Sequence, residues 1–398
     1  MKLVAALRCV AVCALGASCA QGPDAAQTEQ GDTVPIDADF TVGLVEGDSA
    51  YLFGAVVSVA ADQAGRIYVG DRIGATIRVY DGEGQFVQQI ARAGQGPGEI
   101  NGWPADITVD PEGRVYVRDA TRITILAPRA EGGVADSVAA IWPLPGYGNL
   151  SSTRSRVGTS GDYYYPAYLF LDDRLPRFFY LPFRAGTVSN DTLEVPAYAG
   201  LGAHRSASYR TGPRGGRMLE GLSHVPFAPL PVWDVTSSGT ILSADGSAYT
   251  LIETGVGGDT LRVFHGPTSA LVEVPANERA DSIRALDTRL DTLPVPITEV
   301  VNLGADVAER RLPATLPPII GIHIATDGMI WVERWPAEGE AASRFYDVLN
   351  ADGVLQERVV LRAPLVRDPP PFFGARYVAG VVRDADTGVE RVVRFTLR

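Results

Sequence analysis

The sequence predicts an all-β protein, a propeller of six four-stranded antiparallel blades. Two ten-residue stretches, at residues 62–71 (DQAGRIYVGD) and 110–119 (DPEGRVYVRD), are identical at six positions, and their glycines lie 48 residues apart. Each combines an Asp-x-x-Gly turn with a short alternating strand, and such a unit recurring every 40–50 residues or so is typical of propeller blades. The 43 glycines, 28 prolines and three methionines also favour many short strands over long helices.

The first blade can be followed strand by strand. An Asp-Gly turn between alternating apolar runs predicts a hairpin, and DGEG at residues 81–84 is such a turn. The four strands, from the innermost outward, are expected at residues 55–62, 66–71, 76–81 and 86–91.

The second blade follows the connector AGQGPGE at residues 93–99. Its strands are expected at residues 105–110, 114–119, 122–127 and near 136–142. Together, the AGxGPGE connector, the DxxGRxYVxD strand pair and the VYDGEG turn resemble NHL-repeat-like six-bladed propellers, especially those on bacterial lipoproteins. The resemblance is close over about residues 55–127 and implies a ring of six blades.

The later blades carry the same pattern more faintly. Blade 3 is expected to start after the turn TSGD at residues 159–162, blade 4 at Val232 and blade 5 at Ile319. Blade 6 has only two apparent strands, within residues 376–384 and 390–397. Five or seven blades remain alternatives to six.

The two ends of the chain are expected to close the ring. Residues 40–45 form an alternating strand without a hairpin partner, while the last blade lacks a strand. Pairing them protects edges that would otherwise be open. The propeller then covers residues 36–398, with insertions at about 200–222 and 275–317. The second insertion contains a predicted helix at residues 277–293, because Ile283, Leu286, Leu290 and Leu293 recur at helical spacing.

The N-terminus predicts export. Residues 1–18 combine two positive charges with a nine-residue apolar run, as in a signal peptide. The sequence LGASC at residues 15–19 resembles a bacterial lipobox, which implies lipidation of Cys19; secretory cleavage after Ala20 is the alternative. Residues 19–35 are then a flexible tether. The protein is expected in the bacterial cell envelope, as an outer-membrane lipoprotein facing the periplasm or the exterior, with the membrane as a partner through the lipid.

Composition narrows the function classes. All three cysteines lie in the leader, so the mature fold has no disulfide, thiol nucleophile or Cys-ligated zinc. Lys2 is the only lysine, which removes Schiff-base chemistry. The net charge of −12 argues against nucleic acid as a partner. We expect no cofactor and no metal.

The repeated aspartates invite two interpretations. Asp62, Asp71, Asp110 and Asp119 could bind calcium, because hard cations prefer carboxylate oxygens. They recur at the same repeat positions, however, and an aspartate before a glycine turn commonly accepts hydrogen bonds from its own backbone. We therefore predict a structural role in the turns.

Aromatic residues near the start of the innermost strands are the first candidate ligand-binding group. Trp103, Tyr163, Trp233 and His323 are expected around the channel mouth, where they could stack on sugars or peptide side chains. The alternative is that they fill the channel and stabilise the core.

Arginines of the first insertion are the second group. Arg210, Arg214 and Arg217 belong to a basic loop that could bind an anionic group or partner, or simply be solvated. No residue stands out as catalytic, and no GxSxG or HExxH motif is present. The predicted function is binding of a peptide, glycan or partner protein. The alternative is a metal-dependent enzyme, a lactonase-like hydrolase or an NHL-type lyase, in line with the family resemblance.

Overall fold

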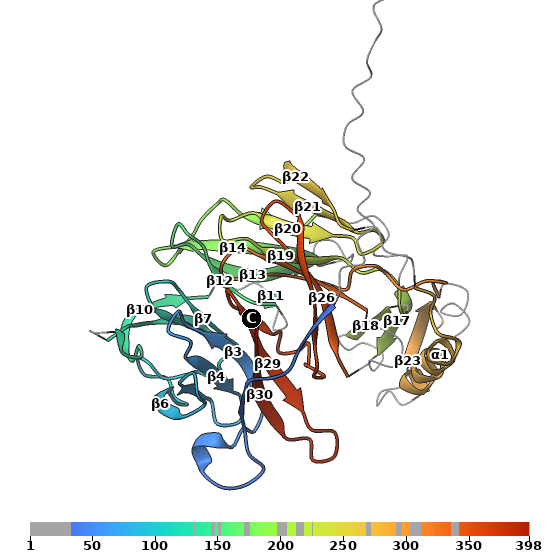
Figure 1. The fold of residues 1–398 in the computed structure, drawn as a ribbon. Coiled ribbons are helices and arrows are strands. Elements are labelled where there is room, and N and C mark those ends of the chain that lie inside the picture. The colour runs from blue at the N-terminus through green and yellow to red at the C-terminus, as the bar shows by residue number, and fades with distance from the viewer. Residues whose placement is uncertain are drawn as a thin grey trace, which may run out of the picture.

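The fold is a ring of six mainly antiparallel sheets around a central axis (Figure 1). The computed structural model describes residues 33–129, 132–144, 148–149, 153–170, 176–196, 205–211, 219–224, 226–267, 272–291, 297–302, 312–335 and 342–397. Innermost strands of neighbouring sheets contact each other, as β3 (Val56–Ala61) contacts β7 (Asp106–Val109), and β19 (Val232–Val235) contacts β24 (Gly321–Ile324). The predicted all-β, six-bladed fold is confirmed.

Blades 1, 2 and 4 are regular, with four strands running outward in chain order. Their second strands are buried along their whole length, so they are mostly apolar on both faces; the polar exceptions are Asp71, Arg118 and Ser243. Blade 1 is β3, β4 (Ile67–Asp71), β5 (Thr76–Tyr80) and β6 (Phe86–Ala91); blade 2 is β7, β8 (Val115–Arg118), β9 (Arg122–Ala127) and β10 (Ser137–Pro143); blade 4 is β19, β20 (Ile241–Ala244), β21 (Thr250–Thr254) and β22 (Thr260–His265).

Blade 3 begins earlier than predicted. Its innermost strand, β12 (Arg156–Val157), precedes the TSGD turn and pairs with β13 (Tyr163–Phe170), which is the second strand. The prediction was wrong because the segment before the turn carries arginines instead of an alternating apolar run. The sheet continues through β14 (Pro176–Arg184) to β15 (Thr187–Val188) and β16 (Leu193–Glu194), and β11 (Gly148–Asn149) also pairs with β13.

The N-terminal segment completes the last two blades. The strand β2 (Phe40–Val42) pairs antiparallel with β30 (Glu390–Thr396), so the predicted ring closure is confirmed. The expected tether ends earlier than residue 35, because Thr33–Ile36 form β1, parallel to β27 (Leu355–Leu361). The other strands are β25 (Ile330–Arg334) and β26 (Arg344–Leu349) in blade 5, and β28 (Phe372–Phe373) and β29 (Tyr377–Arg383) in blade 6.

A seventh sheet lies outside the six blades. It joins β17 (Arg205–Thr211), β18 (Leu219–His224) and β23 (Ile297–Asn302) in the order β18-β17-β23. The helix α1 (Ala276–Asp291) lies beside this sheet in Figure 1 and confirms the predicted inserted helix. None of the helices in the described ranges has the length and apolar content that a membrane span requires.

The repeated aspartates hold the blade turns, as predicted. Asp62 Oδ1 accepts hydrogen bonds from the backbone of Ala64 and Arg66, and its Oδ2 accepts one from the Tyr68 hydroxyl. Asp110 repeats this pattern in blade 2. At the strand ends, Asp71 and Asp119 accept hydrogen bonds from backbone amides of neighbouring segments. These carboxylates serve the local turns.

Replacing Asp110 by alanine should destabilise blade 2 by about 1–3 kcal/mol, because the part-buried donors of Arg114 and the buried hydroxyl of Tyr116 lose their acceptor. Chemical denaturation measures the change. Glu112→Ala, an exposed position in the same turn, is the control and should stay within about 0.5 kcal/mol of the wild type. A rise in the melting temperature on adding calcium that is lost in Asp110→Ala would contradict the structural role.

Candidate functional site

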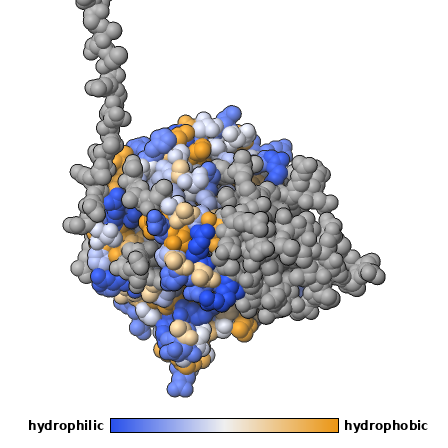
Figure 2. All heavy atoms as spheres, turned by 90° about the vertical axis from the view of Figure 1, so that its right-hand side faces the viewer, coloured by the Kyte–Doolittle hydropathy of each residue, from blue (hydrophilic) through white to orange (hydrophobic). Residues whose placement is uncertain are grey.

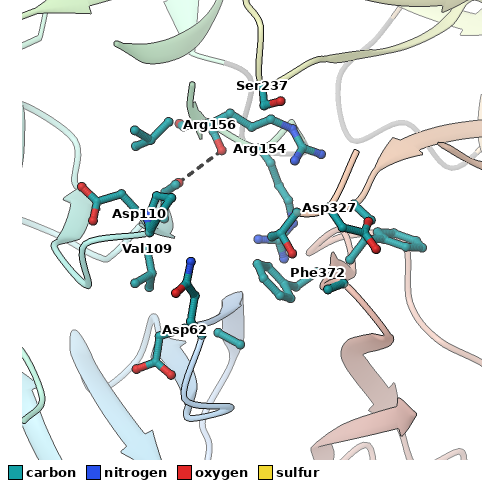
Figure 3. Close-up of a pocket in the computed structure, with 18 of the residues that line it drawn as sticks. Asp62, Val109, Asp110, Arg154, Arg156, Ser237, Asp327 and Phe372 are labelled. Carbon is teal, nitrogen blue, oxygen red and sulfur yellow. Dashed lines mark hydrogen bonds between the residues drawn. The ribbon is translucent and has the colours of Figure 1, made fainter. Parts of the chain in front are cut away.

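A cavity of about 490 Å³ opens at the C-terminal ends of the innermost strands. All six blades contribute to its lining, from Asp62 in blade 1 and Asp110 in blade 2 to Ser237 and Asp327 in blades 4 and 5 (Figure 3). This is the opposite end of the strands from the one where the sequence predicted the ligand. The turns held by Asp62 and Asp110 therefore form part of the rim of the cavity.

Two arginines of blade 3 supply positive charge to the cavity. Arg154 and Arg156 lie two residues apart in an extended segment, yet their side chains diverge (Figure 3). Arg154 donates hydrogen bonds to the carbonyl oxygens of Val59, Pro370 and Pro371, which belong to blades 1 and 6. Arg156 contacts blades 4 and 5 instead. The pair thus links one blade to four others across the axis.

Arg156 is neutralised by a carboxylate. Its Nη2 lies 2.5 Å from Asp234 Oδ2, and its Nε lies 3.2 Å from Asp234 Oδ1. The carboxylate also accepts hydrogen bonds from the backbone amides of Val235 and Ile324, and Arg156 donates to the Ile324 carbonyl. Burial alone would lower the pKa of Arg156, but Asp234 outweighs it and the pKa is raised. Asp234 and Arg156 therefore act as one buried ion pair.

Asp106 holds a second buried network. Its Oδ2 accepts a 2.6 Å hydrogen bond from the Ser155 amide, and its Oδ1 lies 3.3 Å from the hydroxyl of Ser58. The guanidinium of Arg118, fully buried over the ring of Tyr165, lies 3.8 Å from Asp106. These contacts fix the innermost strands of blades 1, 2 and 3 in register.

His323 borders the cavity between blades 5 and 6. Its ring stacks on Phe373 at a centroid distance of 4.3 Å, and its Nε2 lies 3.7 Å from Glu333. Glu333 is also in contact with Arg344 and Arg367. Burial alone would raise the pKa of Glu333, but His323 and Arg367 outweigh this and lower it to about 2.

Because the pKa of Glu333 is lowered, the stability of the folded protein should depend on pH. The pKa of Glu333 is lower in the folded state than in the unfolded state, so its contribution of about 3 kcal/mol is present above pH 4.5 or so. It is lost as the pH falls towards about 2. We expect the stability advantage of the wild type over Glu333→Gln to shrink between pH 5 and pH 2, as measured by urea denaturation. A difference that does not change with pH would contradict the ion cluster.

The predicted aromatic group does not assemble around the cavity, because only His323 lines it. Tyr163 lies on the second strand of blade 3 and is fully buried, stacked on Tyr116 at 5.4 Å. Trp233 lies on the innermost strand β19 and packs on Phe178 at 5.0 Å. Trp103 is 44% exposed, ahead of β7. The structure therefore does not bring the four residues together at this cavity, and Tyr163 and Trp233 pack against neighbouring aromatic rings.

The remaining predicted residues can be placed only in part. Arg210 lies on β17, in the sheet outside the blades. Arg214, Arg217 and Cys19 lie outside the described residues.

The sequence did contain a signal for Arg154. Ser58 and Asp106 hold equivalent positions in blades 1 and 2, 48 residues apart, and one further step of 48 residues reaches Arg154. The repeat therefore points to the channel position in blade 3, and a charged residue there marks a departure from the blade pattern.

Comparison with known proteins agrees with the propeller fold. A family model described as a six-bladed β-propeller matches residues 39–131. The chain is a six-bladed β-propeller. Among curated proteins, no sequence matches this propeller.

Solved structures with a similar fold have low sequence identity to this propeller. A Bacteroides fragilis protein described as exported is 10% identical, with a TM-score of 0.46, covering 92% of this chain and 99% of the other. A member of the duf4221 family from Bacteroides vulgatus is 12% identical, with a TM-score of 0.41 and coverages of 90% and 96%. Virginiamycin B lyase from Staphylococcus aureus is 11% identical, with a TM-score of 0.38 and coverages of 90% and 98%. At these values none of them carries an argument about function.

Proposed function

We propose that this protein is an exported, lipid-anchored binding module that takes a peptide, a glycan or a segment of a partner protein into its central cavity. The observation that carries the proposal is the convergence of all six blades on one cavity. Its volume of about 490 Å³ is within the range of ligand pockets, which runs from roughly 300 to 1,000 Å³.

The lining suits binding because it combines apolar walls with a few fixed polar groups. Phe372 and Tyr377 of blade 6 supply aromatic surface, and Arg154 and Thr108 supply polar groups. The polar side chains are held by hydrogen bonds to the backbone, so little conformational entropy is lost when a ligand binds. On the face seen in Figure 2, hydrophobic residues are interspersed with hydrophilic ones.

A ligand screen on the full-length protein tests the cavity. Short peptides and oligosaccharides are screened by thermal shift, and each hit is measured by calorimetry on the wild type and on Ser237→Trp. Ser237 is an exposed residue of the cavity lining, so an indole there should obstruct entry with little effect on folding. We expect at least about tenfold weaker binding to the variant. Binding that is unaffected by Ser237→Trp would contradict the cavity as the site.

The matched control for that screen is Asp259→Trp, which places an indole at an exposed turn of blade 4 away from the cavity. It should bind hits like the wild type. Among the described residues, no group of three or more His, Asp or Glu side chains is placed to hold a metal ion. Metal bound at one equivalent, together with lactone hydrolysis or lyase turnover that depends on it, would favour the enzyme alternative.

Membrane anchoring has its own test. Cys19→Ala should release the protein from the membrane fraction, because the variant has no thiol to acylate at the predicted site. Cys13→Ala, within the leader, is the matched control and should remain membrane-bound. A Cys19→Ala protein that stays in the membrane fraction would contradict the lipid anchor.

A further inference from the structure

Arg154 keeps part of its donor capacity unused. A guanidinium has five N–H groups, and three hydrogen bonds use those of Nε and Nη2. The acceptor distances are 3.0 Å to Pro371 and 2.6 Å to both Val59 and Pro370. Within the described residues, no hydrogen bond is made by Nη1, and this nitrogen is not sealed from solvent. Two adjacent N–H groups thus remain for a ligand.

The charge of Arg154 is also unmatched. In the part of the chain that the structure describes, its three acceptors are neutral carbonyls and no carboxylate forms an ion pair with it, whereas Arg156 has Asp234. Burial lowers the pKa of Arg154 to about 10, with Asp106 opposing the shift and Arg156 adding to it. The group is still a cation at neutral pH. A buried cation without a counter-ion favours an anion from outside.

The surroundings of Arg154 limit the shape of that anion. The guanidinium carbon lies 5.7 Å from the ring centre of Phe372, so an apolar wall adjoins the charge. Tyr377 extends this aromatic surface, because its ring centre lies 5.9 Å from that of Phe372. A ligand that places an anionic group at Nη1 therefore has an apolar part next to it.

The acidic residues at the rim favour a ligand with one negative charge over a ligand with two. Asp62 and Asp110 lie at the mouth and are each paired with an arginine of their own turn, but Asp327 is exposed, and in the described ranges it forms no ion pair. The whole chain is acidic as well, at −12. A dianion such as a phosphate monoester meets more repulsion than a carboxylate does, for the same two N–H donors.

We propose that the central cavity recognises a carboxylate attached to an aromatic or apolar group, bound at Nη1 of Arg154 with its apolar part on Phe372. This inference rests on the proposed cavity-binding function and names the ligand class. Such a ligand could be a free carboxylic acid or the C-terminus of a peptide. Both present the same chemistry, and the experiment separates them.

Calorimetry on the full-length protein compares acids with their uncharged amides. The probes are 3-phenylpropanoate and its amide, N-acetylglycylphenylalanine and its C-terminal amide, and phenyl phosphate. We expect at least one acid to bind about tenfold or more tighter than its amide, because a charge-assisted hydrogen bond is lost in the amide. We also expect phenyl phosphate to bind more weakly than that acid. Selectivity for the peptide acid alone would identify a C-terminus, and selectivity for phenylpropanoate would identify a free acid.

Two variants test whether Arg154 causes the preference for the acid over the amide. Arg154→Gln should remove the preference for the acid, while Arg92→Gln, which makes the same change at a surface ion pair, should preserve it. If Arg154→Gln does not fold, the comparison of acid and amide on the wild type still decides the matter.

The possible failures are distinct. If acid and amide bind equally and both are lost in Ser237→Trp, the carboxylate inference falls and the cavity function stands. Acid-selective binding that survives Ser237→Trp overturns both. Tighter binding of phenyl phosphate, or no binding of any probe at millimolar concentration, overturns the carboxylate inference.

Discussion

Replacing Asp234 by alanine is expected to destabilise the propeller by about 3–5 kcal/mol, because the variant leaves the buried guanidinium of Arg156 without its counter-ion. The backbone amides of Val235 and Ile324 lose an acceptor at the same time. Urea denaturation at neutral pH measures the change in the free energy of unfolding. The effect should be large because one carboxylate serves the innermost strands of three blades.

A double-mutant cycle separates the ion pair from the backbone contacts. Adding Arg156→Met to Asp234→Ala removes the unpaired charge and should recover part of the lost stability. Asp259→Ala, at an exposed turn of the same blade, is the matched control and should stay within about 0.5 kcal/mol of the wild type. A loss below about 1 kcal/mol for Asp234→Ala would show that Arg156 is not dependent on this partner.

Replacing Phe40 by alanine should weaken the ring closure by about 3–5 kcal/mol. Phe40 is 5% exposed, belongs to the core between β2 and its neighbours, and lies beneath the guanidinium of Arg394 at 5.2 Å. Loss of β2 would also uncover the edge of β30, so we expect concentration-dependent aggregation of the variant at elevated temperature. Thermal unfolding combined with light scattering reports both effects.

Thr41 offers the matched control for Phe40. It lies between two buried residues of the same strand and faces solvent, so Thr41→Ala keeps the ladder and should change stability by less than about 0.5 kcal/mol. An equal loss in both variants would mean that the backbone pairing of β2, rather than the burial of its side chains, decides closure.

The fold was predictable because its determinants are local and repeated. The Asp-x-x-Gly turn specifies its own hydrogen bonds within five residues, so two copies at Asp62 and Asp110 were enough to predict a blade. The closing strand could also be predicted, because the unpaired strand near the N-terminus can complete the last blade by pairing with it. The innermost strand of blade 6 could not, because Phe372–Phe373 form a ladder of only two residues after three prolines.

The cavity was harder to predict because its side chains depend on contacts between blades. Arg154 donates hydrogen bonds to carbonyl groups that lie more than 90 residues before it and more than 200 residues after it in the sequence. The blade repeat points to position 154 as a channel position, but the sequence does not show which carbonyl groups the Arg154 guanidinium meets. The prediction for Tyr163 failed for a different reason: Tyr163 was expected at the start of an innermost strand, but it lies on the second strand of blade 3 and faces the core between two blades.

The meeting of the two chain ends also has a kinetic consequence. Asp39 and Arg394 are 355 residues apart and form a bidentate ion pair. The blade that contains β2 therefore cannot be completed until β30 has been made. Pairings of such high contact order form slowly. Until then β2 lacks its partner and the ring is open, so strand edges are exposed to proteases and to aggregation until β30 is in place.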